Sequence, residues 1–170
     1  MPKITEKEIY KKHAPHKIAI NLLKKGVEVD LKLTGHCMRP IMQENDTIHI
    51  IPIPFKSLNY GDIAVFFIED NRIKTHRFIR FKRINGKLCI ITKSDRRKSY
   101  DPPIPISQFL GIVSCVKRGN KIYDFCCVRW RKINFLLSKL SRPLGIIEFG
   151  VRLPFRIIYW LIRVSLIRVS

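Results

Sequence analysis

The most constraining feature of this chain is a series of short segments in which apolar and polar residues alternate. At residues 27–34 every second residue is apolar, which is the pattern of a half-buried strand. Further strand-like segments lie at residues 47–51, 63–68, 73–81, 88–92, 111–116 and 121–125. Asn85-Gly86 indicates a type I′ hairpin turn between two of them. Because no helix long enough for parallel crossovers separates these segments, we expect a mainly β fold with a coiled antiparallel or barrel-like sheet.

Two segments with a different composition and residue pattern flank this region. Residues 5–25 predict one or two short helices broken at Pro15, which end at Lys25-Gly26. The residues expected on the apolar side of this helical segment are Ile18, Ile20, Leu22 and Leu23. In residues 126–170 bulky apolar residues alternate irregularly with arginines, which indicates basic amphipathic helices. The sequence therefore predicts an N-terminal helical segment at 1–26, a β domain at 27–125 and a C-terminal tail at 126–170.

The charge of the chain indicates an anionic partner. Its formal net charge is +20, from 33 Lys and Arg against 13 Asp and Glu. Anionic lipid and nucleic acid both attract clustered cations, but the N-terminal segment is too short for a DNA-reading helix-turn-helix domain. The tail joins arginines to Trp and Tyr, so we expect residues 126–170 to lie on an anionic membrane surface. A nucleic-acid partner is the less favoured alternative.

The location of the protein is predicted from its apolar segments. The N-terminus lacks the apolar run that a secretory signal contains. The longest uncharged run near the C-terminus, residues 157–162, is far shorter than the roughly 20 residues of a spanning helix. We therefore expect a cytoplasmic protein, peripheral at the inner face of the membrane.

The five cysteines show no Cys-x-x-Cys pair and no zinc-ligand spacing, so we predict no metal site, cofactor or disulfide framework. Cys89 and Cys115 lie in apolar runs, where a cysteine is usually a small buried side chain. Cys37 differs, because it lies in the polar stretch Gly35-His36-Cys37-Met38-Arg39-Pro40.

Five blocks of the sequence, in order, resemble those of the signal-peptidase and LexA-like peptidase family, where the Cys37 box and the element that follows it count as one block. The stretch around Cys37 is similar to the G-x-S-M-x-P box, with cysteine in place of the nucleophilic serine. It is followed by an equivalent of the x-G-D-x-V element in which Asn45 replaces the glycine, and asparagine tolerates the same left-handed backbone. Residues 60–66 are similar to the GDIVVF block, and residues 91–95 are similar to the TKGD block. The two remaining matching blocks are residues 74–79 and 109–113.

The resemblance implies a catalytic site. Cys37 falls on the nucleophile, His76 on the base and Asp101 on the third, acidic position. In such a triad the imidazole takes the thiol proton, and the carboxylate orients the imidazole and supports its positive form. An oxyanion would be bound by backbone N–H groups of the loop formed by Gly35, His36, Cys37, Met38 and Pro40.

Two alternatives stay open within the site. Lys74 lies two residues before His76 and so on the same strand face, which permits a Cys37–Lys74 dyad. Asp95 competes with Asp101 for the imidazole. Met38 is expected to pack beneath the site, while His36 and His49 are expected to be surface or strand residues.

The resemblance implies a peptidase that cleaves a precursor or leader peptide by an acyl-enzyme mechanism. The glycine of the TKGD box is Ser94 in this chain. Because of this departure and the cysteine substitution, an inactive binding module with a peptidase-like fold stays an alternative.

Overall fold

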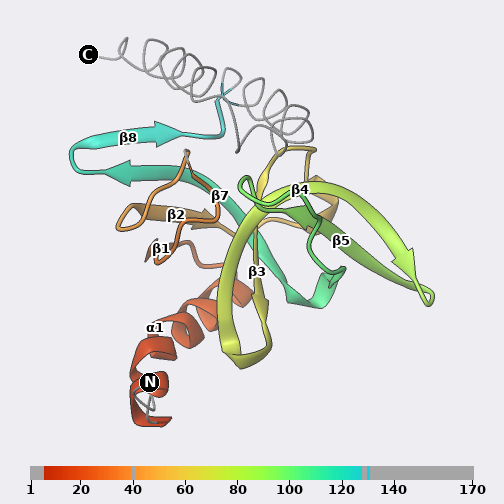
Figure 1. The fold of residues 1–170 in the computed structure, drawn as a ribbon, viewed down its shortest axis with the longest axis horizontal. Helices are drawn as coiled ribbons and strands as arrows, with labels where there is room; N and C mark the ends of the chain where they lie inside the picture. Colours follow the sequence, from red (N-terminus) through yellow and green to blue (C-terminus); the bar gives the residue numbers. More distant parts are fainter. Residues whose placement is uncertain (1–5, 40, 128–129, 131–170) are drawn as a thin grey trace.

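The computed structural model describes residues 6–39, 41–127 and 130, with side chains from residue 15 onward, and is mainly β (Figure 1). Its helix and strands are α1 (Glu6–Lys24), β1 (Val29–Lys32), β2 (Thr47–Ile51), β3 (Ile63–Ile68), β4 (Arg72–Ile84), β5 (Lys87–Lys93), β6 (Ile104–Pro105), β7 (Phe109–Arg118) and β8 (Lys121–Asp124). Short 3₁₀ helices lie at η1 (Phe55–Ser57), η2 (Glu69–Asn71) and η3 (Ile106–Gln108). The predicted helices of the tail lie outside the described residues.

All strand pairs are antiparallel, and the strands form one curled, half-barrel sheet with the order β1-β2-β7-β3-β4-β5-β6. The mainly β, antiparallel prediction is therefore confirmed. Strand β7 joins the two halves of the sheet, because it pairs with β2 on one edge and with β3 and β8 on the other. The prediction missed β6, a two-residue strand in a proline-rich segment with no alternating pattern.

A long hairpin made by β4 and β5 extends away from the rest of the sheet (Figure 1). Its turn is the predicted Asn85-Gly86 pair, and both residues have positive φ, 48° and 74°. Two successive left-handed residues define the type I′ geometry that matches strand twist. Local turn chemistry thus sets the register of this hairpin.

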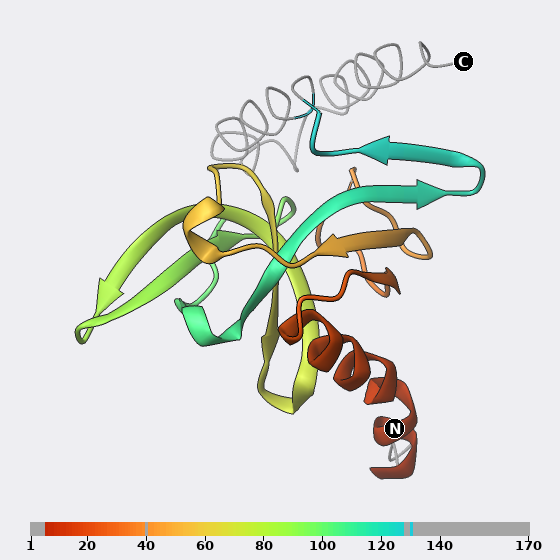
Figure 2. The ribbon, with the colours of Figure 1, turned by 180° about the vertical axis from the view of Figure 1, so that it is seen from behind.

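The predicted break at Pro15 is wrong, because α1 continues through this residue (Figure 2). Proline removes only one backbone donor and its fixed φ is helical, so a helix with other anchors can tolerate it. One such anchor is adjacent: the Ile73 N–H donates to Nδ1 of His16 at 3.1 Å. The predicted end at Gly26 is confirmed, where φ is 84° and the Val27 N–H donates to the Leu22 carbonyl, as in a Schellman motif.

The apolar side of α1 is narrower than predicted. Ile20 and Leu23 are buried together with Ala19, whereas Ile18 is 61% and Leu22 37% exposed. At 100° per residue, positions 16, 20 and 23 share one face of the helix, and 18 and 22 lie on another. Only the first face packs on the sheet.

The sheet buries side chains on both of its faces. On β3, Ile63 and Val65 belong to one apolar cluster with α1, β2 and β7, while Ala64 and Phe66 belong to a second with Phe78 and Ile90 of the hairpin. Because successive strand residues point to opposite faces, a run that is apolar throughout fits a strand covered on both sides.

Trp130 lies in the first of these clusters, 4% exposed, with its ring 4.9 Å from that of Phe125. This tryptophan belongs to the segment 126–170 that the sequence predicts to lie on a membrane surface, but its own side chain is buried in the protein. Its large apolar ring completes the core instead. Within the described part of the chain, no helix has the length and hydropathy needed to cross a bilayer.

Candidate active site

Cys37 lies on a loop between β1 and β2 that is closed tightly at its base. The Leu33 N–H donates to the Asp46 carbonyl at 2.8 Å, and the Asn45 N–H donates to the Leu33 carbonyl at 3.0 Å. Asn45 has φ 71°, the left-handed conformation expected of it from the sequence. The loop thus returns to the sheet through a turn that few residue types adopt.

A buried ion pair fastens this loop to β7. Asp46, 3% exposed, accepts two hydrogen bonds from the Arg118 guanidinium, at 2.8 and 2.6 Å, and a third from the Gln43 N–H. Arg118 also donates to the Ile41 carbonyl at 3.1 Å. Bidentate arginine pairs hold a planar geometry, so the loop is positioned from two directions. No pattern in the sequence indicated this role for Arg118.

Ser94 positions the nucleophile candidate itself. Its hydroxyl, which is buried, donates to the backbone carbonyl of Cys37 at 2.6 Å, and the Arg96 N–H approaches the same oxygen at 3.4 Å. A glycine at position 94 would have no hydroxyl to donate. The residue that departs from the TKGD box therefore supports the Cys37 loop.

His76 connects Cys37 to Asp101. Its Nδ1 lies 2.6 Å from Oδ2 of Asp101, and the same oxygen accepts a hydrogen bond from the Thr92 hydroxyl at 2.7 Å. The Asp101 N–H donates to the Thr92 carbonyl at 2.9 Å, which fixes the carboxylate. Because Nδ1 faces Asp101, Nε2 is the nitrogen left to interact with Cys37, which lines the same cavity as His76.

The pKa of His76 is raised and the pKa of Asp101 is lowered. Burial alone would lower the pKa of His76, but hydrogen bonds with Asp101 and with Cys37, and their charges, raise it to about 9. Burial would raise the pKa of Asp101, but the hydrogen bonds from His76 and Thr92 bring it below its ordinary value. Near neutral pH, His76 is therefore an imidazolium beside an ionised Asp101.

The two alternative residues have different surroundings. Asp95 makes a double hydrogen bond with the buried Arg77, at 2.9 and 2.7 Å, and so belongs to another ion pair. Arg77 also donates to the Gly61 carbonyl. Lys74 is exposed on the strand that carries His76, and its charge acts on Asp101. The structure places Asp101, not Asp95, against the imidazole.

The site opens into a cavity of about 460 Å³. Cys37, His76 and Lys74 line it together with apolar residues of β1 and of the Cys37 loop. Strand β4 forms one wall, and between Arg72 and His76 it pairs with β3 alone among the described strands, since β5 begins to pair at Arg77. Along this wall the Ile73 N–H donates to Nδ1 of His16, and the Cys37 thiol lies 4.0 Å from the Thr75 carbonyl oxygen.

The remaining residues predicted for the loop have separate roles. Met38 is buried in the core and lines the cavity, as expected. His36 is exposed and pairs with Glu44 at 3.3 Å, and Gly35 has φ 142°. Pro40 lies outside the described residues. Among the hydrogen bonds of the described chain, the N–H groups of Cys37 and Met38 donate to no partner, so both are available to an oxyanion.

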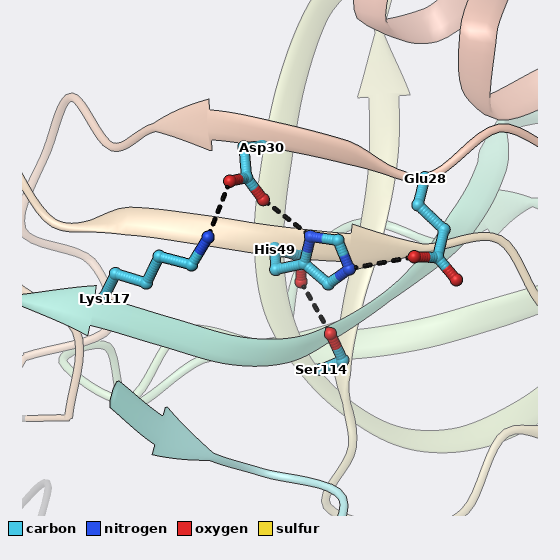
Figure 3. Close-up of polar contacts among 5 residues, drawn as sticks. All are labelled: Glu28, Asp30, His49, Ser114 and Lys117. Atoms are coloured by element: carbon cyan, nitrogen blue, oxygen red, sulfur yellow. Dashed lines mark hydrogen bonds and ion pairs between the residues drawn. The ribbon is translucent and has the colours of Figure 1, made fainter. Parts of the chain in front are cut away.

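A second histidine–carboxylate cluster lies on β1, β2 and β7 (Figure 3). His49 bridges two carboxylates, because its Nδ1 faces Asp30 and its Nε2 faces Glu28. Lys117 also binds Asp30. Ser114 lies nearby but donates to the His49 backbone carbonyl, at 3.2 Å, rather than to the ring. The cluster contains serine, histidine and aspartate without the contact that a nucleophile requires.

Searches with the sequence found no matching protein-family model and no significantly similar curated protein. Over the described residues, no group of three or more His, Cys, Asp and Glu side chains is arranged to hold a metal ion.

Proposed function

We propose that this protein is a cysteine peptidase that cleaves a precursor or leader peptide through an acyl-enzyme on Cys37. The observation that carries the proposal is the placement of His76, which is hydrogen-bonded to Asp101 at 2.6 Å and lines one cavity together with Cys37. A nucleophile, a base and an orienting acid in one chain of contacts form the minimal machinery for acyl transfer.

The reactive form in this proposal is a Cys37 thiolate beside a His76 imidazolium. The raised pKa of His76 favours this state, in which the proton already resides on the ring. The histidine then acts first as an acid rather than as a base. An extended substrate would lie along the part of β4 that β5 does not pair, where main-chain hydrogen bonds can align it beyond the Ile73 N–H that His16 already binds.

The chemistry proceeds in two halves. The thiolate attacks the substrate carbonyl carbon, a C–S bond forms, and the carbonyl electron pair moves to the oxygen, near the N–H groups of Cys37 and Met38. The His76 imidazolium gives its Nε2 proton to the leaving nitrogen as the C–N bond breaks, which leaves a thioester. Neutral His76 then takes a proton from water, the oxygen of that water attacks the thioester, and the acid is released as the thiolate and imidazolium return.

A thiol-directed, peptidyl acyloxymethyl ketone probe tests the proposal, together with mass spectrometry of peptide-library cleavage. We expect labelling and cleavage in the unaltered protein, loss of both in Cys37→Ala and His76→Ala, and retention in Cys89→Ser. Labelling that survives His76→Ala would separate the thiol from its base and refute the mechanism. If Lys74→Met abolishes labelling while His76→Ala keeps the labelling, a Cys37–Lys74 dyad replaces the mechanism with His76 as the base.

The proposed setting is the cytoplasmic face of a membrane, with residues 131–170 as the anchor, because Trp130 is buried in the core. The support is compositional, namely the net charge of +20 and the arginines interleaved with apolar residues in the tail.

A further inference from the structure

The cavity beside Cys37 has an apolar floor and a cationic rim. Met38, Met42 and Ile48 of the floor are buried in the main core, and Leu31, Leu33 and Ile73 pack against it. Lys32, Arg72, Lys74 and Arg97 also line the cavity. Within the described part of the chain, no Asp or Glu lines it.

The rim cations come from three separate segments, namely the end of β1, the start of β4 and the loop after β5. Lys32, Lys74 and Arg97 are exposed and have no ion pair among the described residues. Arg72 pairs with Asp70 at 3.3 Å, an exposed contact of the kind that contributes little. Asp101, a half-buried carboxylate next to the cavity-lining His76, is paired with that histidine. The field at the cavity mouth is therefore positive.

The volume of the cavity fits a peptide residue with a large side chain. About 460 Å³ is within the range of small-molecule pockets and can enclose a leucine- or phenylalanine-sized group. An apolar side chain on the floor would leave the neighbouring residues of an extended peptide at the rim, because successive side chains point to opposite sides. Those neighbours would meet Lys32, Lys74 or Arg97.

We propose that the peptides taken by this site carry a carboxylate beside a large apolar residue, so that the apolar side chain fills the floor and the carboxylate binds the rim cations. This inference deepens the proposed peptidase function and rests on it. The carboxylate can belong to an Asp or Glu side chain or to a peptide C-terminus. The chain's own charge keeps anions near the site and repels basic peptides.

Binding to full-length Cys37→Ala, measured by fluorescence anisotropy, tests the selectivity without catalysis. Three peptide sets share one leucine: amidated peptides with Glu beside it, amidated peptides with Gln, and Gln peptides with a free C-terminal carboxylate. We expect either carboxylate set to bind roughly fivefold or more tightly than the amidated Gln set at about 20 mM salt, with the difference largely lost at about 500 mM. Which of the two carboxylate sets binds better identifies the source of the carboxylate.

A charge-matched pair of variants separates the rim from the overall charge of the protein. Lys32→Glu with Arg97→Glu should remove the preference for carboxylate peptides. Lys82→Glu with Arg83→Glu changes the net charge equally on exposed hairpin residues outside the cavity and should retain it. Equal binding of all three peptide sets, or equal loss in both double variants, would overturn the inference.

Cleavage of the same peptides by the unaltered protein separates this inference from the peptidase function. Carboxylate-selective binding without cleavage, in a protein that the acyloxymethyl ketone probe also fails to label, would refute the peptidase function and leave the selectivity standing. Cleavage of all three peptide sets at equal rates would support the peptidase and refute the selectivity.

Discussion

Replacing Asp101 with asparagine tests the electrostatic core of the site. The asparagine amide can keep a hydrogen bond to Thr92 or to the ring, but it lacks the negative charge that supports the imidazolium. The pKa of His76, about 9 in the unaltered protein, should fall to its ordinary value of about 6.5 or lower, because burial then acts against the charged form. At pH 8 the imidazolium fraction would drop from about 90% to about 3%.

The raised pKa of His76 also stabilises the folded protein, and this stabilisation depends on pH. A folded-state pKa raised from 6.5 to about 9 is worth about 3 kcal/mol, which is fully present below pH 6.5 and is lost as the pH rises through 9. Asp101, whose folded pKa is lowered, contributes above the unfolded value near 3.8 and loses its contribution as the pH falls. Asp101→Asn should therefore destabilise the fold most between about pH 5 and 7 and much less at pH 10.

Nitrogen NMR titration of the His76 ring and urea unfolding at pH 6 and 10 measure the two effects. Asp30→Asn is the matched control, because Asp30 makes the same 2.6 Å contact with Nδ1 of His49 on another part of the sheet. It should leave the His76 titration unchanged. If His76 titrates alike in Asp101→Asn and in the unaltered protein, the assignment of Asp101 as the orienting carboxylate is wrong.

Further predictions concern reactivity, positioning, packing and the tail. Peptide mapping after brief iodoacetamide treatment near neutral pH should find Cys37 labelled first among the five cysteines, and equal labelling of all five would contradict the thiolate assignment. Ser94→Ala removes the 2.6 Å hydrogen bond to the Cys37 carbonyl and should cost about 1 kcal/mol in urea unfolding and slow Cys37 labelling, whereas unchanged labelling would show that Ser94 does not position the thiol. Gly111→Ala would place a Cβ in steric overlap with the Ile51 carbonyl oxygen and should destabilise by about 2 kcal/mol or more, against about 1 kcal/mol for Gly119→Ala, whose Cβ meets open space; equal losses would refute the close-approach argument. Full-length protein should float with anionic vesicles and a chain ending at Trp130 should not, and equal flotation of the two would exclude the tail as the anchor.

Local patterns in the sequence predicted the sheet well, because strand alternation and left-handed turns depend on near neighbours. The strands β2 and β3 have the predicted bounds, and Asn45 and the Asn85-Gly86 turn have the predicted backbone. The unbroken helix at Pro15 and the strand β6 were missed. Both depend on contacts with distant segments, such as the bond between His16 and Ile73, which no local pattern contains.

The candidate site was also predicted only in part from local sequence patterns. Ordered motif blocks selected Cys37, His76 and Asp101, and the structure brings these three together, although their catalytic role stays a prediction. The supporting residues were not identified. Ser94 acts across 57 positions and Arg118 across 72, and both contacts exist only once the sheet has closed.

The position of β7 determines when, during synthesis of the chain, the residues of the candidate site can come together. Among the described strands, the half of the sheet that carries the Cys37 loop and the half that carries His76 meet only through this strand, which is the last long one to leave the ribosome. A nascent chain that ends before Phe109 contains the thiol, the imidazole and Asp101, yet lacks the strand that aligns them. Through most of the synthesis of this domain, Cys37 is therefore not held against His76 and Asp101, and the three residues come together only when the sheet is nearly complete.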